Sequence, residues 1–272
     1  MSSADAHIAL LAADAGFARG IAAPDLGLAG RVLVLPRLDL DAGAWTPPTP
    51  ADGDAAPLAL LVDGLVGRHV ALGERVATQL LGPGDVFDPW AGAADDLLPR
   101  SVRWSVLAPA TIAVLDGRFA TAAQRWPALS RTAQARLAAV GERLAVHLAI
   151  CQLPRVEQRV LALLWHLAER FGRVAPDGVV LGLRLTHRMI GELVGAQRPT
   201  VSLALTGLLE DGLVARRDDG TLVLDAASRG TFAPAGVPAP LAPPAPAPAP
   251  AVAVATGDLL ERVSVVRSDL AA

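Results

Sequence analysis

Residues 185–214 read LTHRMIGELVGAQRPTVSLALTGLLEDGLV. Thr186 is a suitable N-cap, and the apolar residues after it share one helical face until Gly195, which suits a left-handed helix end. A second helix is expected over about 198–211, because the proline in its first turn loses no hydrogen bond there. Gly191 is small enough to let the two helices cross closely. The stretch therefore predicts two short helices joined by a tight turn.

The neighbouring segments extend this unit on both sides. Gly212 stops the second helix, and short apolar runs around a polar turn follow it. The expected elements are a helix over Val156–Phe171, a hairpin within Gly172–Leu185 that turns at Pro176–Gly178, the two helices above, and strands at Leu213–Ala215 and Thr221–Leu224 around the turn Arg216–Gly220. This order of elements predicts a helix-turn-helix followed by a β wing.

A helix-turn-helix reads DNA when its second helix projects polar side chains from its N-terminal turn into the major groove. An arginine there can donate two hydrogen bonds to guanine, and a glutamine can pair with adenine. Arginines on a wing suit phosphates, which position a protein without reading sequence. The candidate DNA-binding residues are Thr186, His187 and Arg188 on the first helix, Gln197, Arg198, Thr200 and Ser202 on the second, and Arg216 and Arg217 on the wing.

One alternative remains open for this unit. Asp218 and Asp219 offset the charge of the wing, and residues 155–229 contain ten arginines against nine acidic residues, so the segment has no strong basic bias. Some winged helices bind other proteins instead of DNA. The unit is then a ligand-sensing or protein-interaction module that does not bind DNA specifically.

The first half of the chain has a different hydropathy pattern. From Arg31 to about Asp116, short apolar segments alternate with Gly, Pro and Asp residues. Such spacing is typical of a β-sandwich or a β-roll. The expected strands are Val32–Leu35, Leu58–Val62, His69–Leu72, Ala77–Leu81, Val102–Leu107 and Thr111–Leu115. Residues 82–85 predict a turn and residues 39–54 a loop, whereas residues 1–30 are only weakly patterned.

One long amphipathic helix is expected from Phe119 to Gln152, because apolar residues recur there at three- and four-residue steps. Its narrow, alanine-rich seam suits packing against a second copy of itself, which predicts a homodimer. The alternative is a helix lying on its own β domain. His147 and Cys151 are four residues apart on this helix, but no further histidine accompanies them, so no metal site is expected.

Composition excludes several other classes of protein. The chain has 272 residues, a net charge of −3 and one cysteine, so an internal disulfide or a cysteine-rich zinc site is excluded. No apolar run approaches the roughly 18 residues of a membrane helix, and the N-terminus lacks a basic signal-peptide region. We therefore expect a cytoplasmic protein. It carries no recognisable enzyme motif, and we expect no enzyme activity. Residues 230–272, rich in proline and alanine, predict a disordered tail.

The chain resembles the Crp/Fnr family, the cyclic-AMP receptor and fumarate–nitrate regulators of transcription. Residues 185–202 and 208–214 carry the resemblance, which extends more weakly over 31–226 through 64–66, 82–87, the strand after Arg100 and 119–152. It implies an α+β fold with an N-terminal cyclic-nucleotide-binding-like β-roll (a double-stranded β-helix), a dimerisation helix and a C-terminal winged helix-turn-helix. The implied domains are the β-roll sensor at 1–118, the helix at 119–152, the DNA-binding domain at 153–229 and the tail at 230–272.

The resemblance also implies a function. A homodimer would bind double-stranded DNA at a near-palindromic operator, with RNA polymerase as a further partner. Arg198 matches the base-reading arginine of the family's recognition helix, and Thr186 matches its phosphate contact. Leu203 stands where some members carry a second arginine, so the operator sequence need not be theirs.

Members that bind cyclic nucleotides carry a Gly-Glu pair for the ribose and an Arg-Ser pair for the phosphate. Here Arg100 and Ser101 stand at a plausible place, but Val86–Trp90 occupies the region of the Gly-Glu pair. Pro89 removes an amide donor there and Trp90 adds bulk. We therefore expect the roll to take another ligand or none, with a cyclic nucleotide as the less favoured alternative. Gly84, Arg100 and Ser101 are the candidate ligand-binding residues, and no cofactor is assigned.

Overall fold

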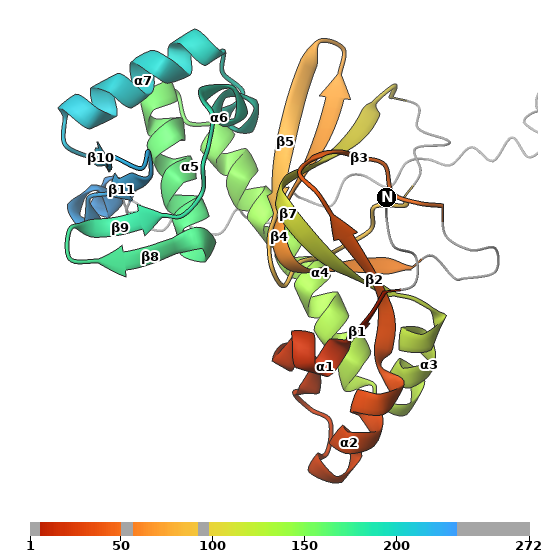
Figure 1. Ribbon diagram of the computed structural model, residues 1–272. Coiled ribbons are helices and arrows are strands. Elements are labelled where there is room, and N and C mark those ends of the chain that lie inside the picture. The colour runs from red at the N-terminus through yellow and green to blue at the C-terminus, as the bar shows by residue number, and fades with distance from the viewer. Residues whose placement is uncertain (1–5, 50–56, 92–97, 233–272) are drawn as a thin grey trace, which may run out of the picture. The chain divides into compact units, whose positions relative to one another are not determined.

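The N-terminal half forms an antiparallel β-roll in a computed structural model, which describes residues 6–49, 57–91 and 98–232 (Figure 1). Its main path runs in the order β1-β2-β7-β4-β5, with β3 paired to β7 and β6 paired to β4. The strands are β1 (His7–Ala9), β2 (Val34–Leu40), β3 (Gly43–Trp45), β4 (Leu58–Leu72), β5 (Arg75–Leu81), β6 (Val86–Phe87) and β7 (Ser101–Leu115). The predicted fold class, an α+β chain with a β-roll, is confirmed.

Two strands are much longer than the sequence indicated. The predicted pairs 58–62 with 69–72, and 102–107 with 111–115, are each one continuous strand, β4 and β7. The β4–β7 ladder shifts register between Leu61 and Val66, and such bulges let a strand bend without leaving its partner. Gly64 lies at this bend with a φ of 93°, and a Cβ there would stand 2.3 Å from the carbonyl oxygen of Pro109. The close approach of the two strands requires a glycine at that position.

The weakly patterned N-terminus is ordered by burial. It contains β1, α1 (Leu10–Ala13), the 3-10 helix η1 (Ala15–Ala18) and α2 (Ala23–Val32). Leu10 and Phe17 are fully buried in the core of the roll. The strand expected from Val32 is wrong at its start, because Val32 ends α2 and β2 begins at Val34. The loop expected at 39–54 likewise includes β3, which pairs Trp45 with Trp104.

The predicted helix over 119–152 is two helices, α3 (Gly117–Arg125) and α4 (Ala128–Cys151). Trp126 lies between them with φ −123° and ψ 83°, because the following Pro127 disfavours a helical conformation there. The indole of Trp126 is buried and donates to Asp25 at 3.3 Å, which holds the break in place. The single-helix prediction was therefore wrong at its N-terminal end.

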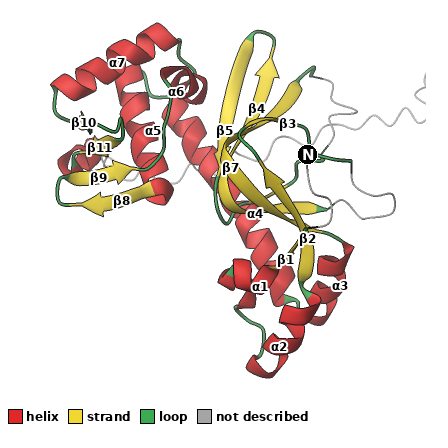
Figure 2. Cartoon of the chain, viewed as in Figure 1, coloured by secondary structure: helices red, strands yellow, loops and turns green. Residues whose placement is uncertain are grey.

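The C-terminal half is a winged helix with its own core (Figure 2). Its elements are α5 (Val156–Phe171), β8 (Gly172–Ala175), β9 (Gly178–Leu181), α6 (His187–Val194), α7 (Arg198–Glu210), β10 (Val214–Arg216), β11 (Leu222–Leu224) and the 3-10 helix η2 (Ala226–Phe232). The strands form one sheet in the order β10-β11-β9-β8. The predicted helices, hairpin and wing are confirmed here almost residue for residue.

The predicted tail lies mostly beyond the described residues. Residues 230–232 belong to η2, and the rest of the predicted tail, 233–272, lies outside the described residues. No helix in the described part of the chain is both long enough and apolar enough to cross a membrane.

Candidate nucleic-acid interface

Local signals build the helix-turn-helix as the sequence predicts. The hydroxyl of Thr186 accepts a hydrogen bond from the amide of Met189 at 3.1 Å and so caps α6. Gly195 ends α6 in the left-handed region with a φ of 66°. A Cβ on Gly191 would stand 2.6 Å from the carbonyl oxygen of Ala196, so only glycine lets the turn fold back on α6.

The N-terminal turn of α7 is exposed beside the start of α6. Val201, Leu205 and Leu208 bury one side of α7 in the core, which leaves the other side to solvent. Four predicted DNA-binding residues from both helices line one open hollow of about 450 Å³, namely Thr186, His187, Arg188 and Arg198. Gln197 and Thr200 are also exposed at this end of α7. The structure thus brings most of the predicted contacts together on one surface.

Ser202 differs from the other candidates because its hydroxyl is already engaged. It donates to the carbonyl oxygen of Arg198 at 3.1 Å, and Nδ1 of His187 lies 2.8 Å from it. Since the serine proton is used on the backbone, His187 Nδ1–H is the donor in the second bond. The pair ties the start of α6 to the first turn of α7, so it orients the surface in addition to forming part of it.

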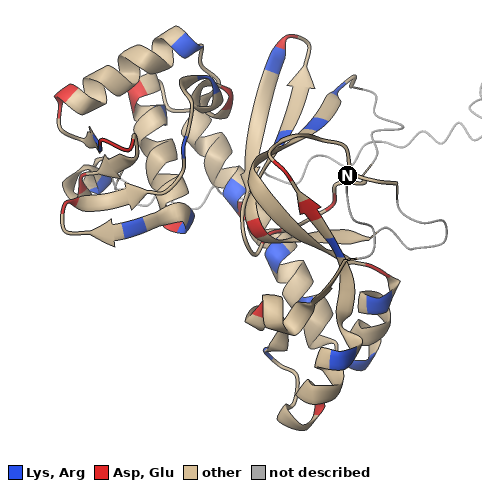
Figure 3. Ribbon diagram, viewed as in Figure 1, with Lys and Arg blue, Asp and Glu red and all other residues tan. Residues whose placement is uncertain are grey.

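The two wing arginines have different surroundings. Arg217 is held by Asp177 in the β8–β9 turn, with Nη2 at 2.8 and 2.7 Å from the two carboxylate oxygens. Arg216 at the end of β10 is exposed and forms no ion pair among the described residues. Figure 3 shows basic and acidic residues interspersed over the elements, without one continuous basic stripe. Arg216 is therefore the better placed of the two for a phosphate.

A polar chain connects the roll to α6, and the sequence did not reveal it. The hydroxyl of Thr78 in β5 donates to Oε2 of Glu192 at 3.0 Å. His69 in β4 lies 2.8 Å from that hydroxyl through Nδ1 and 2.7 Å from the hydroxyl of Ser105 through Nε2. Because Thr78 uses its proton on Glu192, Nδ1–H of His69 donates to Thr78, and Ser105 donates to Nε2 of the neutral ring. Glu192 also pairs with Arg188 at 3.0 Å. Only this i,i+4 spacing of Arg188 and Glu192 could have been read from the sequence.

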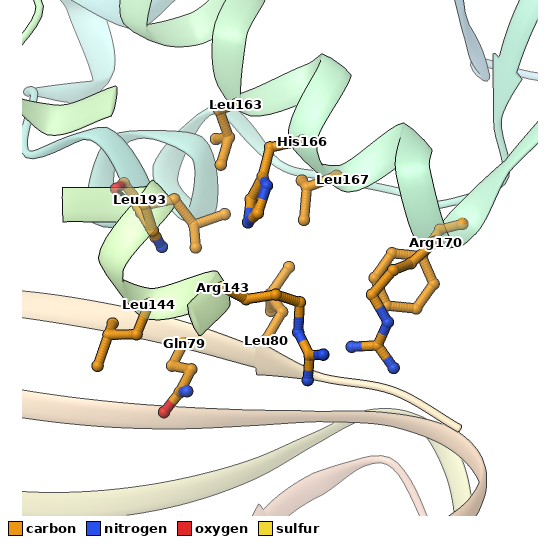
Figure 4. A pocket seen from close by; sticks show the side chains of 11 residues that line it. Gln79, Leu80, Arg143, Leu144, Leu163, His166, Leu167, Arg170 and Leu193 are labelled. Carbon is orange, nitrogen blue, oxygen red and sulfur yellow. Dashed lines mark hydrogen bonds between the residues drawn. The ribbon is translucent and has the colours of Figure 1, made fainter. Parts of the chain in front are cut away.

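A second junction lies at Asp85, in the turn between β5 and β6. Its buried carboxylate accepts from Gly82 N at 2.9 Å, from Arg170 of α5 at 2.7 Å and from Arg143 of α4. The two arginines approach each other beside a small cavity of about 40 Å³, with His166 of α5 nearby (Figure 4). One aspartate therefore holds three elements of the chain together.

We expect the protein to lose stability as the pH falls below about 6.5, the ordinary pKa of histidine. Burial lowers the pKa of His69 below its usual 6.5, against the opposing charge of Glu192, and Arg103 and Arg188 lower it further. Burial also lowers the pKa of His166, which faces Glu169, His147, Arg143 and Arg170. These two histidines therefore take up protons more readily in the unfolded chain than in the folded one. Their contribution to the free energy of unfolding is fully present above about pH 6.5 and is lost as the pH falls through the folded pKa values.

Urea unfolding at about pH 7.5 and pH 5.5 measures this change in the free energy of unfolding. The double variant His69→Gln/His166→Gln keeps polar side chains at both positions and should show a clearly smaller loss. An equal loss in the double variant would assign the effect to other groups.

The candidate ligand-binding residues of the roll are not gathered at one point. Gly84 donates its amide to Leu61 of β4, whereas Ser101 pairs with Ala71, ten positions further along the same strand. The interior of the roll is aromatic, because the ring of Trp104 meets Trp45 edge to face at a centroid distance of 5.9 Å and lies 5.4 Å from the ring centroid of Phe87. Trp90 packs on this cluster and donates its indole N–H to Pro48 at 2.6 Å.

His147 and Cys151 face the helix-turn-helix. Both side chains contact the carbonyl oxygen of Leu193, His147 Nε2 at 2.5 Å and Cys151 Sγ at 3.4 Å. Burial raises the pKa of the Cys151 thiol. No group of three or more metal-ligating side chains is found in the described part of the chain. This geometry assigns the pair to the contact between α4 and α6.

The β-roll, the long helix α4 and the winged helix together define a class of transcription regulators with a helix-turn-helix of the DNA-binding type. Residues 158–228 match the family model of the Crp-like helix-turn-helix domain. The chain is 32% identical over 155 residues to the regulatory protein CysR of Synechococcus elongatus. The aligned residues cover 56% of this chain and 67% of CysR. The chain therefore belongs to the Crp/Fnr family of transcriptional regulators.

Solved structures show the same fold at lower sequence identity. A mutant of CooA from Carboxydothermus hydrogenoformans matches with a TM-score of 0.56 and 22% identity, over 71% of this chain and 84% of that one. A cyclic nucleotide-binding domain containing protein from Listeria monocytogenes matches with a TM-score of 0.57 and 15% identity, over 70% and 89% of the two chains. CysR is by its name a regulatory protein.

Proposed function

We propose that this protein is a homodimer that binds a near-palindromic DNA operator and inserts the N-terminal turn of α7 into the major groove. The observation that carries the proposal is the shared hollow of Thr186, His187, Arg188 and Arg198 at the exposed end of the two helices. Arg198 supplies the base-reading donor, and Arg188 and Arg216 supply phosphate contacts. Residues 1–118 form the sensor in this scheme, 119–152 the dimerisation segment and 153–229 the DNA-binding domain.

An apolar stripe on α4 supports the dimer. Leu137, Leu144 and Leu148 are 42%, 40% and 61% exposed, and their spacing of seven and four residues places them on one face of the helix. Leucines on one exposed face of a long helix suit packing against a second helix. Two copies joined along α4 would present two α7 helices about 34 Å apart, one turn of DNA.

The contacts between the roll and α6 support regulation by the roll. Glu192 lies in the first helix of the DNA-binding unit, and the hydroxyl of Thr78 in the roll, which is itself bonded to His69, donates to it. A ligand that moves β5 would change the position of α6, and with it the surface that meets DNA. RNA polymerase is the further partner in this proposal, because a regulator bound at an operator acts on transcription.

The salt dependence of DNA binding tests the proposal against the alternative of a module that does not bind DNA. Arg188 and Arg216 from two protomers would contact four phosphates, so affinity for a selected site should fall about 100-fold between 50 and 200 mM salt. Fluorescence anisotropy with selected and with random duplexes measures both affinities. Weak, salt-independent binding that is equal on the two duplexes would favour the protein-interaction module.

A further inference from the structure

Leu203 is a large apolar side chain on the exposed face of α7. It is 74% exposed, whereas Leu205 and Leu208 of the same helix are 2% and 4% exposed. Pro199 and Thr206 lie four residues before and three residues after it, which places all three on one side of the helix. This side is opposite the core, so it is the side that a helix in the major groove turns toward the bases.

The hydroxyl groups beside Leu203 are already engaged. Ser202 donates to the carbonyl oxygen of Arg198 at 3.1 Å, and Thr206 donates to the carbonyl oxygen of Ser202 at 3.0 Å. Each hydroxyl proton is therefore donated to a backbone carbonyl oxygen of α7, four residues earlier in the helix. Beside Leu203, α7 therefore offers the groove apolar groups from Pro199 and Leu203, and the exposed Thr200 lies one turn earlier.

The major groove contains one apolar group that differs between bases, the C5 methyl group of thymine. We propose that Leu203 determines part of the specificity of this protein by contacting a thymine methyl group in each half of the operator. The proposal rests on the proposed function, because it requires α7 to enter the groove. Arg198 and Leu203 are five residues apart, which is about 7.5 Å along a helix. The thymine should therefore lie within about two base pairs of the guanine that Arg198 reads, at roughly 3.4 Å per pair.

Replacing single thymines by uracil tests this inference, because the change removes only the methyl group. In a selected operator, each symmetric pair of thymines is exchanged in turn, and affinity is measured at one salt concentration. For the wild-type protein one pair should weaken binding by about 4-fold per methyl group, or about 15-fold for both half-sites. Leu203→Ala should weaken binding to the thymine operator by a similar factor and should then be insensitive to uracil at that pair.

Thr206→Val is the matched control, since it alters the same face but leaves Leu203 in place, and it should keep the sensitivity to uracil. The exposed Leu203 side chain contributes little to the core, so Leu203→Ala should fold as the wild type does. Salt-dependent binding that no uracil exchange weakens would overturn the role of Leu203 and leave the proposed function intact. Failure of the wild-type protein to select any DNA would instead overturn the proposed function.

Discussion

Arg198→Ala is expected to lower affinity for the selected operator by about 1,000-fold while it changes affinity for random DNA far less. A bidentate contact between arginine and guanine discriminates by about 2 kcal/mol, and the proposed homodimer would make two such contacts. Arg198 lines the open hollow at the start of α7, and no described carboxylate pairs with it, in contrast to Arg217. Its guanidinium group is therefore ready to donate to a base.

Competition between operator and random duplexes in fluorescence anisotropy measures this change in specificity. Arg173→Ala is the matched control, because it removes the same charge from β8, the strand at the opposite edge of the sheet from β10. The control should lose little affinity for either duplex. If Arg198→Ala keeps the wild-type preference for the operator, α7 does not read DNA through this residue.

Asp85→Ala is expected to destabilise the protein by about 3 kcal/mol. The carboxylate is 2% exposed, and its loss leaves two partly buried arginines, Arg143 and Arg170, facing each other without a counter-charge. Removing one partner of a buried ion pair costs several kcal/mol, mainly because the remaining charge is left unpaired. Since α4, α5 and the β5–β6 turn meet at this residue, the effect should extend to both halves of the chain.

Urea unfolding measures this loss, followed both by far-UV circular dichroism and by tryptophan fluorescence. Asp63→Ala removes an exposed carboxylate from β4 and should change the free energy of unfolding by no more than about 0.5 kcal/mol. Asp85→Asn keeps the shape of the side chain and should still lose most of the stability, because the missing charge causes the effect. A wild-type stability in Asp85→Asn would show that packing, not charge, holds the junction.

The winged helix could be predicted from the sequence because its signals act over a few residues. Thr186 caps α6, Gly195 adopts the left-handed conformation that ends it, and Pro199 stands in the first turn of α7. Each of these residues acts through its own backbone or through neighbours within one turn. The candidate DNA-binding residues were found in the same way, and the structure brings Thr186 and Arg198 to one hollow.

The roll could be predicted as a class of fold but not in its details. Short apolar runs indicated strands, yet they did not show that β4 and β7 each continue through a bend at Gly64. The bend depends on the approach of Pro109, forty-five positions away, as does the register of the whole ladder. The order of the N-terminal residues likewise depends on burial of Leu10 and Phe17 against distant strands.

The amino-acid sequence by itself determined the helix-turn-helix, its wing and the residues of its surface, because caps, glycines and helical spacing are local properties of the chain. Only the tertiary structure decided what Glu192 and Asp85 do, since their partners lie on strands and helices far away in the sequence. It also decided which polar groups of α7 remain free, and so showed that Leu203 stands on its exposed face with the neighbouring hydroxyls engaged. Such contacts form only when the chain has folded, so they cannot be predicted from the spacing of residues along the sequence.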